Sequence, residues 1–287
     1  MFRARSAMTR RETISACTYA EVIYEIITPV LERFANPLPV TIHKMQGYPS
    51  IIAQQVRRTV NIPPDTPISN LINSIEKCGV LFLALPLALE KIDAFSMWAG
   101  TDVKRPIIAL SASKPGDRLR WNTAHELGHL VMHGGLPQLR IQEHREADQF
   151  AAELLMPEAS MHQELTSPVT LSSVAPLKRK WGVAIQSLVR RAFDLNIITQ
   201  RNKDMLFAQI GAKGWRTREP ENLDVPVEKP RALRKMAEIA YGKPINYVRL
   251  ASDAHITVEM ARQIVDGYGE APTPTARGLS EKVIQFR

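Results

Sequence analysis

Residues 125–129 read His-Glu-Leu-Gly-His, and this pentapeptide constrains the chain more than any other stretch of its sequence. On a helix, positions i and i+4 lie one turn apart on the same face, so His125 and His129 can present two imidazoles to one ion. Neutral imidazoles bind Zn²⁺ at about 2.0–2.1 Å. Glu126 is one position on, where its carboxylate can take a proton from metal-activated water without being a ligand. The pattern therefore predicts a zinc-binding helix.

The surroundings of the motif decide between this prediction and a simpler one. Ala124, Leu127 and Leu130 are uncharged, as a helix buried beside a metal requires. The simpler interpretation is an exposed helix without metal, in which Thr123 and Glu126 form a capping box. The apolar surroundings favour the metal site.

A catalytic zinc needs a third protein ligand and one open coordination position. A second helix is predicted over about 142–156, where apolar residues recur at helical spacing. A helical wheel places Glu143 and His144 on either side of its apolar stripe, whereas Glu146 and Glu153 are expected to face solvent. We expect His144 as the third ligand, with Glu143 as the alternative.

Other polar residues near the motif have weaker interpretations. Three ligands at successive i+4 positions on a straight helix cannot converge on one tetrahedral ion, so His133 is expected to complement the helix dipole, with a substrate contact as the alternative. Asp148 follows His144 by one turn and is either an orienting partner of a ligand histidine or a surface charge. Arg118 and Arg120 are expected to be solvated, with binding of an acidic substrate group as the alternative.

The segments HELGHLVMHGG and EADQFAAELLMP together resemble the ImmA/IrrE family of zinc metallo-endopeptidases, as found in longer fusions with a helix-turn-helix domain. The likeness covers about residues 50–220. It implies a zincin-like fold, a bound Zn²⁺, and the ligand and active-site roles of His125, Glu126 and His129. It also implies that the strand over 105–111 is a sheet edge that pairs with an extended substrate.

One position departs from the family pattern. An acidic residue typically lies three places before the first Ala of the A-[DN]-x-F-A segment, and here that position is His144. A third neutral ligand would leave the metal more electropositive and its water more acidic.

The patterning predicts an α+β fold. A small sheet packs on the HExxH helix and the second ligand helix, and an all-α C-terminal region follows. Three apolar segments, 80–85, 92–98 and 105–111, are the predicted strands. The predicted organisation is an N-terminal helical segment (1–49), an ImmA/IrrE-like metallopeptidase domain (50–214), and a C-terminal linker and helical region with a loose tail (215–287).

The composition indicates the cellular compartment and the kinds of partner that suit the chain. Two cysteines exclude a disulfide scaffold and suit a reducing cytoplasm. A net charge of +8 permits an acidic partner or nucleic acid. Near the C-terminus, LASDAHITVEMARQIV has a loose helix-turn-helix spacing without the usual turn glycine, and a packed helical pair is the simpler interpretation.

These features lead to a functional prediction with one alternative. We expect a zinc-dependent endopeptidase that cleaves a helix-turn-helix transcriptional repressor in a stress response, because the family's substrates are of this kind. The alternative is a non-proteolytic DNA-binding regulator, or a toxin–antitoxin component, with a sensory zinc site. Mn²⁺ or Fe²⁺ would suit the same ligands.

Overall fold

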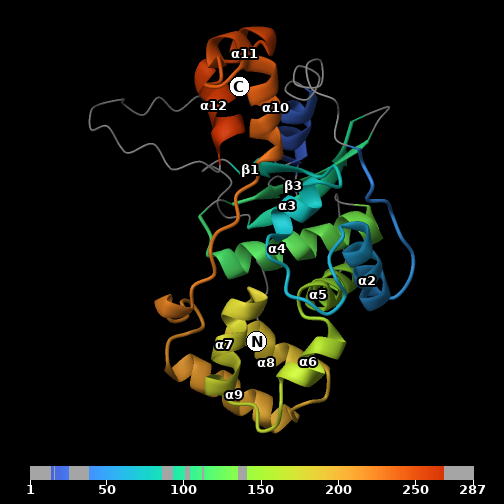
Figure 1. The fold of residues 1–287 in the computed structure, drawn as a ribbon, viewed down its shortest axis with the longest axis vertical. Helices are drawn as coiled ribbons and strands as arrows, with labels where there is room; N and C mark the ends of the chain where they lie inside the picture. The colour runs from blue at the N-terminus through green and yellow to red at the C-terminus, as the bar shows by residue number, and fades with distance from the viewer. Residues whose placement is uncertain are drawn as a thin grey trace.

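A computed structural model shows a small mixed sheet between two groups of helices (Figure 1). The fold is α+β, as the patterning predicts. The structure describes residues 14–15, 17–25, 39–85, 93–100, 104–111, 113–134 and 141–267. The predicted loose C-terminal tail and most of the predicted N-terminal segment lie outside these residues. No helix in the described part is long and apolar enough to cross a membrane.

The sheet has three strands in the order β1-β3-β2. β1 (Leu81–Ala84) runs parallel to β3 (Arg105–Leu110), and β2 (Ala94–Ala99) runs antiparallel to it. These bounds confirm the three predicted strands to within two residues. The expectation that the third is a sheet edge is wrong, because β3 is paired on both sides. All of its residues are buried, which suits a central strand.

One face of the sheet packs on the helices that carry the predicted site. Ile108 and Leu110 of β3 share a core with α4 (Gly116–Gly128), which continues into a π-helical turn, η2 (His129–His133). α4 packs on α5 (Ile141–Leu155). The same core takes in the remaining helices of this part: α2 (Pro49–Thr59), α3 (Leu71–Glu76), α6 (Glu158–Glu164), α7 (Leu171–Trp181), α8 (Ile185–Asp194) and α9 (Gln200–Ala212).

The other face of the sheet is covered by the C-terminal helices. Leu83 and Phe95 from the strands form a second core with α10 (Ala232–Tyr241), α11 (Tyr247–Asp253) and α12 (Val258–Asp266). A helix over residues 17–25 joins this core and lies beside α10 (Figure 1). The predicted all-α C-terminal region is therefore present, and it covers the second face of the sheet.

A connecting segment, residues 213–231 with the short 3₁₀ helix η3 (Glu221–Leu223), joins the two groups of helices. Its Glu228 forms an ion pair with Arg120 of α4 and accepts a hydrogen bond from the backbone N–H of Ile72, 2.8 Å away. The prediction that Arg120 is solvated is wrong, because this guanidinium is buried against a carboxylate. Arg118 does face solvent and pairs with Asp93.

Candidate metal centre

The motif helix changes its winding at the second histidine. α4 is α-helical through Gly128, and residues 129–133 form a π-helical turn that ends at Gly134 in a left-handed conformation (φ +78°). The helix predicted to carry the HExxH motif is therefore present, but its last turn is wider than an α-helical turn. π-turns inserted in α-helices are frequent at functional sites, because they re-aim side chains.

Gly128 lets the two ligand-bearing helices approach each other. A Cβ atom at this position would lie 2.9 Å from Cδ1 of Phe150 and 3.3 Å from Cα of Ala147, both on α5. Real Cβ atoms essentially never come within 3.0 Å of another heavy atom. The glycine of HELGH therefore sets the distance between α4 and α5.

Three histidine nitrogens converge between these helices. Nε2 of His129 lies 3.0 Å from Nε2 of His125 and 3.2 Å from Nδ1 of His144. The third separation, His144 Nδ1 to His125 Nε2, is 3.4 Å. Among the described residues, these three form the group whose donor atoms could hold a metal ion. Glu143, the alternative third ligand, is not in this group.

The spacing of the nitrogens fits a tetrahedral metal. Ligand atoms about 2.0–2.1 Å from a tetrahedral ion lie roughly 3.3–3.4 Å from one another. The observed separations of 3.0–3.4 Å are close to this value. Three imidazole lone pairs aimed at one point repel one another, and a shared cation removes that repulsion. Three ligands leave a fourth position for substrate or water.

Asp148 holds the first histidine in one orientation. Its Oδ1 lies 2.7 Å from Nδ1 of His125. A carboxylate can only accept, so Nδ1 carries the proton and Nε2 keeps its lone pair for the metal. This is the common carboxylate–histidine–metal arrangement.

His133 and Glu146 do the same for the second histidine, and sequence reasoning missed this pair. His133 Nε2 lies 3.0 Å from Oε2 of Glu146, and it donates because a carboxylate can only accept. The other nitrogen of the neutral His133 ring, Nδ1, therefore accepts a hydrogen bond from Nδ1 of His129, 2.9 Å away. The hydrogen bond from His133 lowers the pKa of Glu146. Glu146 is partly exposed, in line with the prediction that it faces solvent, but its partner was not predicted, because the π-turn brings His133 over to α5. A third histidine at i+4 was the available signal.

The edge strand β2 contacts the motif helix at two points. Ser96 Oγ lies 2.9 Å from Oε2 of Glu126 and 3.0 Å from the backbone oxygen of the same residue. Trp98 Nε1 donates to the backbone oxygen of Leu130 at 3.2 Å. Glu126 is buried, and its carboxylate is held by this strand. A single serine in an apolar strand gives no sequence signal of such a role.

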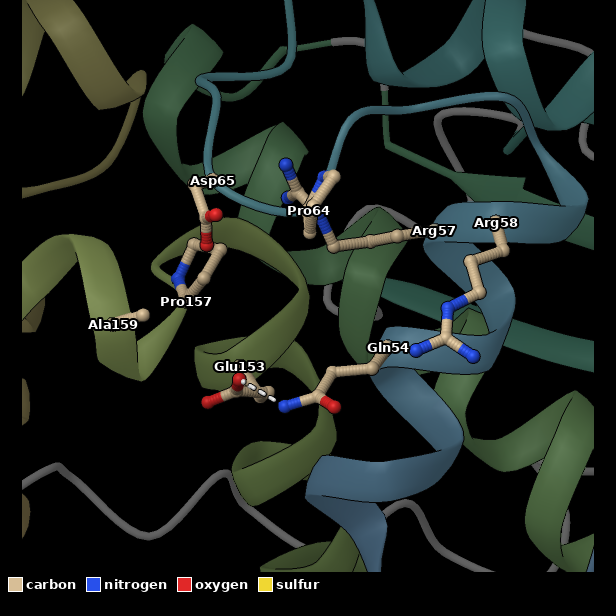
Figure 2. Close-up of a pocket in the computed structure, with 8 residues that line it drawn as sticks. All are labelled: Gln54, Arg57, Arg58, Pro64, Asp65, Glu153, Pro157 and Ala159. Carbon is tan, nitrogen blue, oxygen red and sulfur yellow. Dashed lines mark hydrogen bonds between the residues drawn. The ribbon is translucent and has the colours of Figure 1, made fainter.

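A separate pocket lies where α2, α5 and α6 meet and contains none of the three histidines (Figure 2). Its main polar groups are already paired. Arg57 donates to the backbone oxygens of Leu154, Pro63 and Thr66, and burial lowers its pKa to about 10. Glu153 accepts from Gln54, 3.1 Å away, and pairs with Arg191. The prediction that Glu153 faces solvent is wrong, because this ion pair braces α5 against α8.

A known family model matches the part of the chain that carries the three histidines. Residues 75–193 match the Peptidase_M78 family model, described as the IrrE N-terminal-like domain. Over these residues the chain is similar to the ImmA/IrrE peptidase family, and the resemblance seen in the sequence is confirmed there. The match runs from the end of α3 through α8 and includes all three histidines, but not α9–α12. A search of curated proteins found no match.

Proposed function

We propose that the chain is a metal-dependent endopeptidase, with zinc as its metal and a helix-turn-helix transcriptional repressor as its substrate. The observation that carries the proposal is the convergence of His125, His129 and His144 inside a peptidase-family domain. The cytoplasm is the setting we propose, on the cysteine content alone.

The chain's own residues supply the remaining parts of a hydrolytic site. A bound Zn²⁺ would supply Lewis-acid activation of water and of the peptide carbonyl. Glu126 would accept the proton of the attacking water and deliver it to the leaving amine. Ser96 holds that carboxylate. The edge of β2 can receive an extended peptide through backbone hydrogen bonds, in place of the edge expected of β3.

Cleavage of a candidate repressor by the purified full chain tests the proposal. We expect the wild type with Zn²⁺ to cut the helix-turn-helix repressor encoded beside its gene, and Glu126→Gln to be slower by about 10²–10⁴-fold. Glu158→Gln, an exposed carboxylate outside the site, is the matched control and should cleave normally. Equal cleavage by the wild type and Glu126→Gln, or by neither, would contradict the proposal.

A further inference from the structure

α11 and α12, the last two helices of the part of the chain that the structure describes, have the spacing of a helix-turn-helix. α11 ends at Asp253, α12 begins at Val258, and four residues lie between them. His255 in this turn has a left-handed backbone (φ +54°), the conformation that a glycine supplies in many such turns. The backbone N–H of Ile256 donates to the oxygen of Ala251 at 2.9 Å, which closes the end of α11. The missing turn glycine is thus replaced by a strained histidine.

The side chains that α11 and α12 turn toward each other and toward the core are small or apolar. Four of them are at most 7% exposed: Leu250, Ala251, Ala261 and Ile264. Short side chains at Ala251 and Ala261 let the helices pack closely. Together with α10, the pair makes a three-helix unit (Figure 1).

The exposed face of α12 is polar. Glu259, Arg262 and Gln263 are exposed. The C-terminal end of α12 lies at the sheet, where a Cβ at Gly267 would come within 2.6 Å of Ala84 of β1. The N-terminal end of α12 is therefore the distal end, and Arg262 and Gln263 lie at the middle of the helix, on its exposed side.

We propose that this three-helix unit binds double-stranded DNA, with α12 in the major groove. Arginine and glutamine are the side chains that make bidentate contacts with guanine and adenine edges, and α12 exposes one of each at successive positions, Arg262 and Gln263. The Arg262 guanidinium lies 4.5 Å from the centre of the Tyr247 ring on α11. The exposed Lys243 precedes α11 and the exposed Arg249 lies on it, and both could contact backbone phosphates. The unit from 231 to 267 has six basic and four acidic residues. DNA binding is independent of the proposed peptidase activity.

The test is binding of the full chain to duplex DNA, measured by fluorescence anisotropy on a random-sequence 20-base-pair duplex at several salt concentrations. Gln263→Glu places a carboxylate against the groove and should weaken binding at least about tenfold. The matched control is Gln209→Glu on α9, an exposed glutamine at the opposite end of the molecule, which should stay within about twofold (Figure 1). Glu126→Gln should bind like the wild type.

Three results would overturn the proposal. The wild type could fail to bind at low salt, Gln263→Glu could bind normally, or both glutamate variants could weaken binding equally. The last result would assign binding to the overall charge of +8. If circular dichroism shows that Gln263→Glu is unfolded, Arg262→Ala replaces it, with the same tenfold criterion and the same control.

Discussion

The third ligand determines the charge of the metal site, and the two candidates are adjacent in the sequence. His144 lies in the nitrogen cluster, whereas Glu143 does not. We therefore expect His144→Ala to bind substantially less zinc than the stoichiometric wild type, and Glu143→Ala to keep the wild-type content. Metal content after gel filtration, measured by plasma mass spectrometry, distinguishes them. Normal zinc in His144→Ala would contradict the assignment.

A second prediction at this scale concerns the pair behind His129. His133→Phe removes the acceptor of the His129 Nδ1 proton, so the ring loses its fixed tautomer and orientation. Zinc affinity, measured by competition with a chromophoric chelator, should fall about tenfold to a hundredfold. His162→Phe is the matched control, since His162 is exposed and its nearest carboxylate is 3.7 Å away.

Glu146→Gln tests how much the negative charge of Glu146 contributes to holding His133. The amide oxygen can still accept the His133 Nε2 proton, but without the charge that strengthens the bond. Its zinc affinity should therefore fall less than that of His133→Phe. A loss in His162→Phe equal to that in His133→Phe would refute the positioning role.

At the scale of elements, the positions of the strands and of the site helices could be predicted from the sequence. The segments that each of them contacts could not. Apolar periodicity predicted the three strands and the second ligand helix, α5. The central place of β3 depends on pairing between distant segments, which no local pattern encodes. Arg120, Glu146 and Glu153 were predicted exposed because charge alone indicates solvent. Each has a partner more than ten residues away.

The approach of α4 to α5 gives the prediction for this scale. Gly128→Ala should push the helices apart against Phe150 and Ala147, destabilising the fold by about 1–3 kcal/mol and weakening zinc binding. Gly211→Ala on α9 is the control. Its Cβ would meet only the flexible end of Arg216, so its helix propensity should stabilise by about 1 kcal/mol. Urea unfolding and zinc titration measure both, and unchanged zinc affinity in Gly128→Ala would contradict the argument.

At the scale of the whole molecule, buried ion pairs hold the helices below the sheet to the connecting segment. Lys178 of α7 is buried between Asp117 at the start of α4 and Glu219 of the connecting segment, whose Oε2 is 2.9 Å from Nζ. Burial opposes the charge, but the hydrogen bonds to Asp117 and Glu219 outweigh it and raise the pKa of Lys178. One ammonium therefore joins three parts of the chain.

Removing this ammonium should be costly because two carboxylates lose their buried partner. We expect Lys178→Met to lower the free energy of unfolding by about 3–5 kcal/mol. Lys180→Met is the control, since Lys180 is half exposed and its pair with Glu164 is worth about 0–1 kcal/mol. A loss below 1 kcal/mol in Lys178→Met would contradict this account.

The pH dependence of the stability provides an independent check of the contact between Lys178 and its two carboxylates. Because the pKa of Lys178 is raised in the folded state, its contribution is fully present below the unfolded value of about 10.4. The contribution is lost as pH rises from there through the folded pKa. Wild-type stability, measured by urea unfolding between pH 8 and 12, should therefore fall more steeply above about pH 10.4 than that of Lys178→Met. Parallel curves would show that the lysine charge does not hold these segments together.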